Sequence, residues 1–252
     1  MGRKVILKTE KEIALMRKAG YKVSKLLHEM AEMAVPGMST GEIDKFAESR
    51  CKDLNCTPAF KGYKGFPASV CISINEEAIH GIPSFERIIK AGDIVGLDFG
   101  VVYQGWYGDA ACTVSAGTIS YGADELLSAT NISLFLGIEQ CQPGNRMGDI
   151  GHAIQSYAES NGFGVVRNFS GHGIGRSLHE EPEVPNFGNK GEGLLLRVGM
   201  VLAIEPMFTM GNHKVKVLDD GWTIVTEDGS LAAHFEQTVA ITPDGPEVLT
   251  RF

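Results

Sequence analysis

Ile94-Val-Gly-Leu-Asp-Phe-Gly-Val-Val-Tyr-Gln-Gly-Trp-Tyr-Gly-Asp-Ala-Ala-Cys-Thr113 is the segment around which the rest of the chain is organised. Its β-branched and aromatic residues form two runs that meet at Gln104-Gly105, and this pattern predicts a β-hairpin. If the loop is even-membered and centred there, Tyr103 faces Trp106. A three-residue loop or a bulge would change this register.

The same register places two carboxylates on the hairpin. Asp98 faces Ala111, and Asp109 lies on the same face as Ala111, diagonal to Asp98, with Cβ atoms roughly 7–8 Å apart. Two carboxylates on one face of an apolar hairpin repel each other and resist burial. We therefore expect a positively charged group between them.

The composition is that of an ordinary globular protein. The 252 residues are 43% hydrophobic and 21% charged, and no apolar run has membrane-spanning length. The first thirty residues form a charged amphipathic pattern rather than a signal peptide, so we expect a cytoplasmic protein. The five cysteines lack CxxC spacing, which argues against a disulfide framework and a zinc knuckle. The net charge of −8 disfavours general nucleic-acid binding, so neither DNA nor a membrane is expected as a partner.

Helix and strand signals alternate along the chain. Capping boxes at Thr9-Glu-Lys-Glu12 and Ser39-Thr-Gly-Glu42 predict one helix that ends before Pro36-Gly37 and a second that runs to about Asp53. Two more helices are expected, one from residue 123 towards 142 and one over about 147–161. Strand patterns occupy residues 69–75, 164–169, 199–208, 215–218, 223–226 and 234–242 in addition to the hairpin.

Two segments of the first half recur 107 residues later. Pro36-Gly-Met-Ser-Thr-Gly-Glu-Ile43 aligns with Pro143-Gly-Asn-Arg-Met-Gly-Asp-Ile150, and Gly92-Asp-Ile-Val-Gly-Leu-Asp98 aligns with Gly199-Met-Val-Leu-Ala-Ile-Glu205. This period is too long for a solenoid and indicates two copies of a half-domain, which would bring Asp98 and Glu205 together between the halves. We predict one α+β domain over residues 1–252, with half-repeats of about 1–120 and 121–252. Its helices pack on a curved, mainly antiparallel sheet.

Three further ionisable residues lie where an apolar segment does not need them. Glu205 interrupts residues 200–208, Glu236 interrupts residues 235–241, and His172 lies in a Gly-rich loop whose glycines allow close approach of the backbone. Each residue alone is most often a hydrogen-bonded structural group. With Asp98 and Asp109, however, they make four carboxylates and one imidazole.

This donor set predicts a metal centre. Oxygen-rich ligation with one histidine suits Mn²⁺, Fe²⁺ or Co²⁺ and permits Zn²⁺. Four carboxylate charges also balance two divalent metal ions. A two-metal site of this kind acidifies water and polarises a carbonyl, so it indicates a hydrolase.

With these residues in place, the chain resembles the type I methionine aminopeptidases in their short bacterial form. The resemblance rests on the order Asp98, Asp109, His172, Glu205 and Glu236, with Gly-His-Gly-Ile-Gly and Ile-Glu-Pro as local contexts. It covers nearly the whole chain and implies the pita-bread fold, whose two related halves agree with the repeat. It also implies a metal-dependent exopeptidase that removes the N-terminal methionine from nascent proteins and peptides by means of a metal-bridging hydroxide.

The resemblance implies a role for each member of the metal centre. Asp98 would chelate one metal, Asp109 and Glu236 would bridge the two, and His172 and Glu205 would bind the other. Glu205 would also shuttle a proton during catalysis.

The resemblance extends to the substrate. His179 would steady the oxyanion, and His80 would contact the amide beyond the scissile bond. The methionine side chain would enter an apolar pocket formed by Tyr63, Phe66, Cys71 and Trp222. Two departures reshape that pocket: Phe60 stands where some bacterial members have a smaller residue, and Leu178 precedes His179 where an aromatic residue is common.

Basic residues near the N-terminus suggest a partner. Lys18, Lys22 and Lys25 belong to eight Lys and Arg side chains that face only two glutamates before residue 26. Such a cluster is most often a solvated helix face. The alternative is a surface by which a monomeric enzyme docks on the ribosome, where nascent N-termini emerge.

Other functions remain open at this point. A proline-specific pita-bread enzyme, such as an aminopeptidase P or a prolidase, shares the five ligands but usually carries an additional N-terminal domain. A non-catalytic, ribosome-associated pita-bread protein would typically lose ligands. Cys71 with His80 as its base would make a nucleophilic pair, although no orienting partner is evident.

Overall fold

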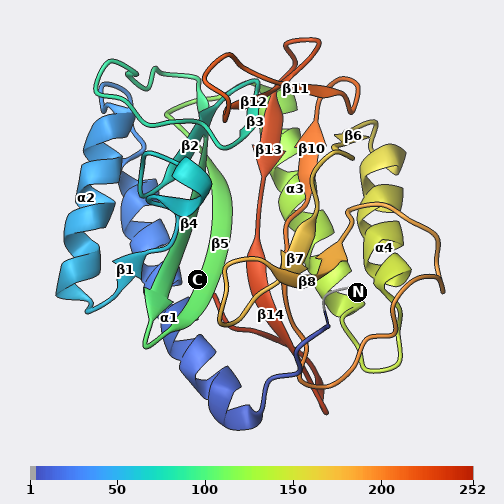
Figure 1. Ribbon diagram of the computed structural model, residues 1–252. Helices are drawn as coiled ribbons and strands as arrows, with labels where there is room; N and C mark the ends of the chain where they lie inside the picture. Colours follow the sequence, from blue (N-terminus) through green and yellow to red (C-terminus); the bar gives the residue numbers. More distant parts are fainter. Residues whose placement is uncertain (1–3, 252) are drawn as a thin grey trace.

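The computed structural model describes residues 4–251, in which helices flank strands on two sides. The first pair of helices lies on one side of the strands and the second pair on the other (Figure 1). No helix within the described residues is long and apolar enough to cross a membrane. The helices are α1 (Glu10–Met33), α2 (Thr40–Asp53), α3 (Tyr121–Glu139) and α4 (Met147–Ser160), and a single 3₁₀ turn, η1, spans Tyr63–Gly65.

Local capping explains where the first two helices begin. The Thr9 side chain accepts from Glu12 N while the Glu12 carboxylate accepts from Thr9 N, and Ser39 and Glu42 repeat this arrangement. Both capping boxes are therefore confirmed. Each box satisfies backbone donors that the first helical turn would leave unpaired.

The predicted hairpin is confirmed in its register. It consists of β4 (Ile94–Tyr103) and β5 (Trp106–Ser115), with Tyr103 opposite Trp106 and Asp98 opposite Ala111. Gln104 and Gly105 both have positive φ, 51° and 75°, as a two-residue hairpin turn requires. The strands β1 (Thr57–Pro58) and β2 (Cys71–Ile74) extend this sheet on β4.

The remaining strands form three sheets, and strand pairing throughout residues 4–251 is antiparallel. The sheet orders are β13-β10-β6, β11-β12-β3 and β15-β14-β9-β7-β8. The strands are β3 (Glu77–Ile79), β6 (Gly164–Val165), β7 (Gly171–Gly173), β8 (Glu180–Val184), β9 (Val201–Ile204), β10 (Met207–Thr209), β11 (Val215–Val217), β12 (Ile224–Thr226), β13 (Ala232–His234), β14 (Gln237–Thr242) and β15 (Gly245–Val248).

Two predicted strands are each broken at a carboxylate. The run predicted over 199–208 divides into β9 and β10 at Glu205-Pro206, and the run over 234–242 divides into β13 and β14 at Phe235-Glu236. At these breaks the chain crosses between the five-stranded sheet, which holds β9 and β14, and a three-stranded sheet, which holds β10 and β13. Each of the two predicted strands is thus interrupted at a glutamate, Glu205 or Glu236.

The sequence repeat has a counterpart in backbone geometry. Helices α2 and α4 begin and end 107 residues apart. Gly37 and Gly144 have φ of 94° and 95°, and Gly92 and Gly199 have φ of 93° and 90°. These left-handed conformations favour glycine, so the recurring glycines mark the same turns in the two copies.

A seam of hydrogen bonds joins the two halves. Ala111 on β5 pairs with Glu236, whose N donates to Ala111 O at 2.9 Å. On one side of this pair the Thr238 hydroxyl bonds Asp109 N and O, and on the other side the Thr113 hydroxyl bonds His234 N and O. This seam, from 109–113 to 234–238, places Asp109 and Glu236 side by side.

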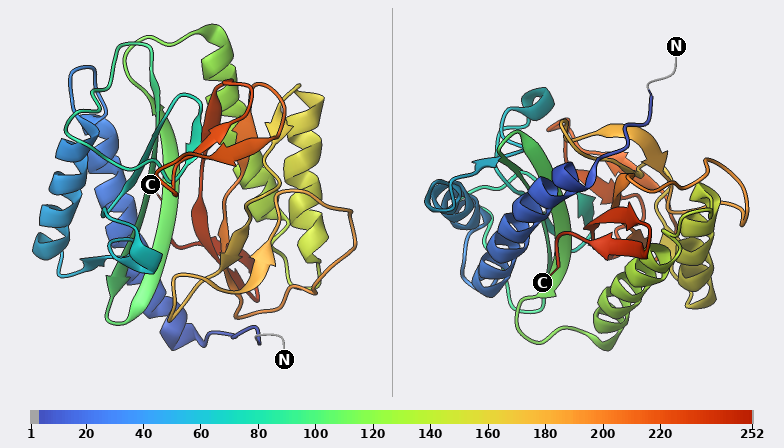
Figure 2. Two further views of the ribbon diagram at one scale, coloured as in Figure 1. Left: turned by 45° about the horizontal axis from the view of Figure 1, so that its top comes forward. Right: turned by 90° about the horizontal axis from the view of Figure 1, so that it is seen from below.

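Each half also has its own apolar core. One core packs α1 and α2 on the hairpin and includes Leu26, Ile43 and Phe99. The other packs α3 and α4 on the second set of strands and includes Leu126 and Ile154. Figure 2 shows the two helical pairs flanking the strands in both further views. The seam lies between the two cores.

Candidate metal centre and its pocket

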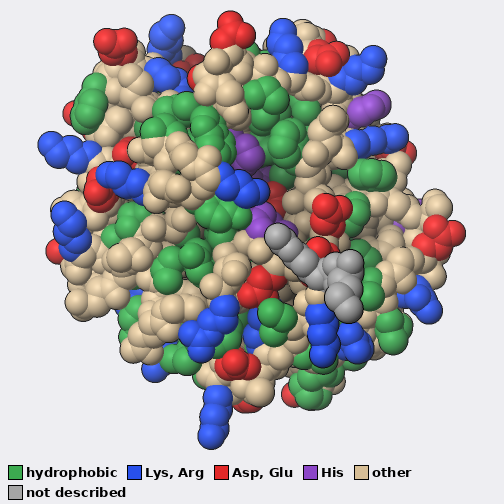
Figure 3. Space-filling view, viewed as in Figure 1, with side chains coloured by type: hydrophobic (Ala, Val, Ile, Leu, Met, Phe, Trp, Pro, Cys, Tyr) green, Lys and Arg blue, Asp and Glu red, His purple; other side chains and the backbone are tan. Residues whose placement is uncertain are grey.

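The predicted site residues surround one cavity of about 140 Å³. Figure 3 shows histidine side chains in the hollow of this face, with hydrophobic side chains around them. The lining residues include every site residue expected from the sequence: Tyr63, Phe66, Cys71, His80, Asp98, Asp109, His172, His179, Glu205, Trp222 and Glu236. Phe60, Lys64 and Leu178 complete the lining.

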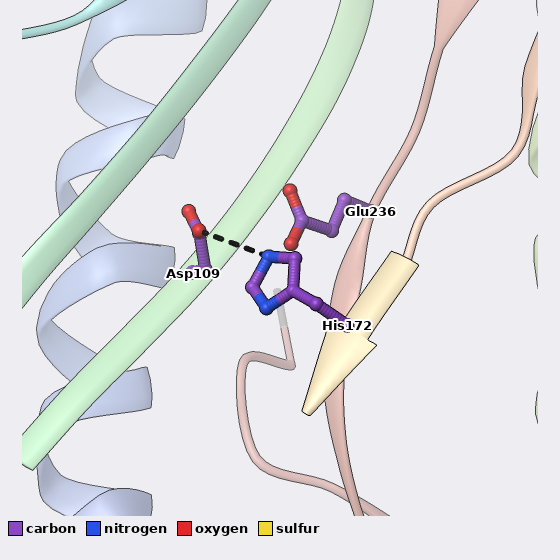
Figure 4. A group of neighbouring side chains, drawn as sticks. All are labelled: Asp109, His172 and Glu236. Atoms are coloured by element: carbon purple, nitrogen blue, oxygen red, sulfur yellow. Dashed lines mark ion pairs between the residues drawn. The ribbon is translucent and has the colours of Figure 1, made fainter. Parts of the chain in front are cut away.

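An acidic cluster lies at the inner end of the cavity. Asp109, His172 and Glu236 each offer a ligand atom within 4.8 Å of the other two, and all three are buried (Figure 4). His172 Nε2 is 4.0 Å from Asp109 Oδ2 and 3.6 Å from Glu205 Oε1. Asp98 approaches from β4, directly opposite Ala111 on β5. The cluster thus draws on both halves of the chain.

His172 lies on a short strand rather than in the loop predicted for it. The reason is the close pairing of β7 with its neighbours, which only glycines permit. A Cβ at Gly171 would lie 2.3 Å from Ala203 O, and one at Gly173 would lie 2.2 Å from Glu181 O. His172 Nδ1 is 2.9 Å from Gly173 O, which can only accept, so Nδ1 carries the proton. Nε2 is then free to bind a metal ion or to accept a hydrogen bond.

Burial opposes ionisation of the four carboxylates. It raises the pKa of Asp98 from 3.8 to about 7 and raises the pKa of Asp109, Glu205 and Glu236 well above their usual range. For the latter three, the neighbouring carboxylates raise the pKa further. Without a positive partner, the four groups cannot all be charged near neutral pH.

Unpartnered atoms show that the cluster fits a metal ion. Asp98 Oδ1, Asp109 Oδ1 and Glu236 Oε1 are buried without hydrogen-bond partners among residues 4–251. Burial also lowers the pKa of His172 to about 4, so its ring is neutral and able to ligate. Buried oxygens without donors and a neutral imidazole suit a divalent metal ion.

Aromatic rings enclose the outer part of the cavity. The rings of Phe66 and Trp222 meet edge to face at 5.1 Å, and Tyr63 stacks on His179 at 5.3 Å. Cys71 is buried beside them, and burial followed by the charges of the nearby carboxylates raises the pKa of its thiol. A protonated thiol is a poor nucleophile, so the structure gives no support to a Cys71–His80 pair.

The two departures noted in the sequence both face this cavity. Phe60 and Leu178 are buried, 7% and 2% exposed, in the same apolar cluster as Phe66 and Cys71. Phe60 also closes over the hairpin, because a Cβ at Gly100 would lie 2.8 Å from its ring. The two side chains therefore set the width of the apolar pocket.

His80 and His179 stand beside the acidic cluster. The centre of the His80 ring lies 6.4 Å from that of Trp222, and the centre of the His179 ring lies 4.1 Å from that of His172. Burial, with a contribution from the charge of Lys64, lowers the pKa of His80 to about 4. Burial, followed by the neighbouring His172 and Lys64, lowers the pKa of His179 to about 3. One part of His179 is exposed at the mouth of the cavity. Both rings are therefore neutral at pH 7 and able to donate a hydrogen bond.

Two residues near the site were not among those predicted. Lys64 lines the cavity mouth in a left-handed conformation, with φ of 49°. His234 lies behind Glu205, with Nε2 3.8 Å from Glu205 Oε2. No motif marks Lys64. His234, however, interrupts an apolar segment just as Glu205 and Glu236 do, and the same criterion would have found it.

Comparison with known proteins identifies one family model. The model of metallopeptidase family M24 matches residues 14–243. The methionine aminopeptidase of Clostridium perfringens is 55% identical over 247 residues, which cover 98% of this chain and 98% of that protein. Methionine aminopeptidase 1 of Bacillus subtilis is 47% identical, covering 98% and 99% of the two chains.

Solved structures agree on the fold. A methionine aminopeptidase from Thermotoga maritima superposes with a TM-score of 0.97 at 46% identity, covering 99% of this chain and all of that one. A prolidase from Pyrococcus furiosus superposes with a TM-score of 0.80 at 24% identity, covering 98% of this chain and 66% of the prolidase. The predicted pita-bread fold is confirmed, and the prolidase likeness concerns the fold alone.

Proposed function

The chain belongs to metallopeptidase family M24, and from this premise we propose that it is a methionine aminopeptidase. It hydrolyses the bond after the N-terminal methionine of nascent proteins and peptides. The main observation in support of this function is that an acidic cluster and an apolar, aromatic pocket line the same cavity. The cluster supplies hydrolytic chemistry, and the pocket supplies the fit for one unbranched apolar side chain.

Divalent metal ions are the cofactors in this proposal. Asp98 would hold one ion, His172 and Glu205 the other, and Asp109 and Glu236 would lie between them. Co²⁺, Mn²⁺ and Fe²⁺ fit this oxygen-rich set with one imidazole, and Zn²⁺ is permitted. When bound, such ions acidify water and polarise the scissile carbonyl.

The methionine side chain would occupy the apolar part of the cavity. Phe66 and Trp222 form one wall, Tyr63 another, and the neutral thiol of Cys71 the floor. Phe60 and Leu178 limit the width of this pocket. An enclosed apolar pocket of this kind suits the flexible, unbranched side chain of methionine.

Three residues handle protons and hydrogen bonds. The neutral ring of His179 would donate to the oxyanion, and His80 would contact the amide beyond the scissile bond. Glu205, whose carboxylate lies in the same cavity, would pass a proton towards the leaving amine as a general acid–base group. Positioned donors of this kind stabilise developing charge more than they stabilise the substrate.

Metal reconstitution tests the function directly. Chelation is expected to abolish hydrolysis of Met-Ala-Ser, and Mn²⁺, Fe²⁺ or Co²⁺ should restore it. Peptides with proline at the second position, assayed side by side, distinguish this enzyme from a proline-specific one. His172→Ala and Asp109→Asn should each lower kcat by several orders of magnitude with the fold retained. Full activity in excess chelator would refute the metal mechanism.

The location, oligomeric state and domain organisation of the enzyme also belong to this proposal. We place the enzyme in the cytoplasm as a monomer of one catalytic domain built from two half-repeats. All five cysteines are free thiols, which suits a reducing compartment. Helix α1 would dock on the ribosome, near emerging N-termini.

The structure narrows the residues available for that docking. Lys22 Nζ donates to Leu54 O at 2.7 Å, and Lys25 pairs with Glu29 at 3.2 Å. Lys18 is exposed without an ion-pair partner among residues 4–251. Lys18→Glu should therefore weaken salt-sensitive co-sedimentation with ribosomes while tripeptide hydrolysis is unchanged. Unaltered co-sedimentation would favour the solvated-face interpretation.

A further inference from the structure

The Glu205 carboxylate lies between two imidazoles. Its Oε1 is 3.6 Å from His172 Nε2, and its Oε2 is 3.8 Å from His234 Nε2. The side chains of Glu205 and His234 are only 12% and 5% exposed. His234 Nε2 is buried and has no hydrogen-bond partner in the described part of the chain. A buried ring nitrogen without a partner, facing a carboxylate oxygen, requires an explanation.

The backbone holds His234 in this position. The Thr113 hydroxyl accepts from His234 N at 3.0 Å and donates to His234 O at 2.8 Å. On the other side, β13 pairs His234 with Met207 on β10. The residue is therefore held between the seam and the neighbouring strand, and its imidazole points at the carboxylate.

Within residues 4–251, no other side chain is placed to donate to the Glu205 carboxylate. Asn186 Nδ2 donates to the Glu205 backbone carbonyl at 2.9 Å, which places the residue without touching its carboxylate. A ligating carboxylate needs a donor on its remaining oxygen to keep its orientation and basicity. An imidazole always carries at least one N–H, and here Nε2 is the ring nitrogen that faces the carboxylate.

We propose that His234 is a positioning residue of the metal centre: its Nε2–H donates to Glu205 Oε2 and orients Oε1 towards the ion shared with His172. This proposal rests on the proposed function, because it assumes a metal ion beside Glu205. His234 Nε2 and Glu205 Oε2 would have to move about 0.8 Å closer to reach a typical N–H···O distance of ~3 Å. The proposal also assigns a role beside the metal centre to a residue that was not among those predicted from the sequence.

Two substitutions separate donation from packing. His234→Gln places an amide nitrogen near the position of Nε2, whereas His234→Asn reaches only the position of Nδ1. In the metal-free protein, the dissociation constants for Mn²⁺ are measured by isothermal titration calorimetry, and kcat is measured on Met-Ala-Ser. His234→Asn should weaken binding of one ion about 10–100-fold, and His234→Gln should recover most of that loss. His152→Asn, on the exposed face of α4, is the matched control and should bind as the wild type does.

Thermal unfolding of each metal-free variant shows whether the fold is retained. Equal weakening by His234→Asn and His234→Gln in folded proteins would overturn the proposal, since it would indicate packing alone. Unchanged Mn²⁺ binding in both variants would overturn it as well. A wild-type protein that hydrolyses Met-Ala-Ser independently of metal would instead contradict the proposed function.

Discussion

The neutral state of the two pocket histidines determines what they can contribute to catalysis. Burial keeps the pKa of His80 near 4 and that of His179 near 3, so neither is a cation at pH 7. A neutral ring next to a cluster that binds metal ions avoids repulsion and still offers one N–H. Their effects should therefore appear in transition-state stabilisation rather than in charge attraction.

His179→Ala should lower kcat by roughly 10²–10³ with little change in KM, because the donated hydrogen bond forms mainly in the transition state. His80→Ala should change kcat and KM together, since it contacts the amide in both states. Steady-state kinetics on a methionyl tripeptide, with metal content measured in the same samples, provides the test. Loss of metal in proportion to activity in His179→Ala would place that residue among the ligands.

Lys64 offers a positive charge at the mouth of the cavity. Its Nζ lies 5.4 Å from the centre of the Tyr63 ring, and no carboxylate pairs with it in the described part of the chain. Lys64→Met should therefore raise KM for Met-Ala-Ser with a free carboxylate more than for its amide. Lys61→Met is the control, since Lys61 pairs with Glu48 at 2.8 Å outside the cavity. Equal changes for acid and amide would contradict a charge contact.

At the scale of elements, the seam between the halves determines the shape of the metal centre. Thr238→Val should lower the free energy of unfolding by about 1–3 kcal/mol, because it leaves Asp109 N and O unpaired in a buried position. It should also weaken Mn²⁺ binding, since Asp109 would shift. Thr242→Val, at the turn end of the same strand, should have a smaller effect on both urea unfolding and binding. Equal effects of the two variants would contradict a special role of the seam.

A buried ion pair ties the N-terminal segment to the loop that carries His179. Lys8 Nζ donates to Glu180 Oε2 at 2.7 Å, and Glu180 Oε1 accepts from Arg176 N and Ser177 N. Lys8→Met should cost about 3 kcal/mol of unfolding free energy, because it leaves a buried carboxylate without its cation.

The loss of unfolding free energy should be smaller in the double variant Lys8→Met with Glu180→Gln, because the glutamine amide carries no charge. Lys11→Met, on the exposed start of α1, serves as the control. Chemical denaturation of the four proteins measures each difference. If Lys8→Met unfolds at the same denaturant concentration as Lys11→Met, the ion pair contributes no stability.

Sequence patterns predicted helices more accurately than strands, for a physical reason. A helix is closed by local hydrogen bonds, so the boxes at Thr9 and Ser39 were sufficient to place α1 and α2. Strand ends depend on partners far away in the chain. Strand β8, for example, forms because it pairs with β7, and its charged sequence has no strand periodicity.

The candidate site shows the same division. The eleven predicted site residues all line one cavity. They could be predicted because their order along the chain matches a family pattern. Lys64 carries no sequence signal, because its place at the cavity comes from a left-handed turn. His234 interrupts an apolar segment and could have been found by that criterion, but its approach to Glu205 depends on the seam, which joins distant parts of the chain.

At the scale of the whole molecule, protons and metal ions compete for one buried cluster. The pKa of Asp98 is raised from 3.8 to about 7 in the metal-free fold. Such a group stabilises the fold fully below the unfolded pKa, and this contribution is lost as pH rises through about 7. The metal-free protein should therefore lose this contribution between about pH 4 and pH 7.

Metal ions reverse that loss, because they bind the ionised carboxylates. Added Mn²⁺ should raise Tm more at about pH 7.5 than at about pH 5.5. Differential scanning calorimetry at fixed Mn²⁺ measures the shift. Asp98→Asn, which cannot titrate, should show a weaker dependence on pH. An equal shift at both pH values would mean that protons and metal ions do not share this cluster.

The seam also has a consequence for synthesis of the chain. Strand β5 pairs with β4 along one edge, and its other edge is covered at 109–113 by residues 234–238. During translation, more than a hundred residues must be added before that covering segment leaves the ribosome. Until then the hairpin presents an uncovered, largely apolar edge, which is the kind of surface that chaperones protect and that aggregates when exposed. Residues 234–238, which follow the hairpin by more than a hundred positions, are therefore expected to protect its edge once they are in place.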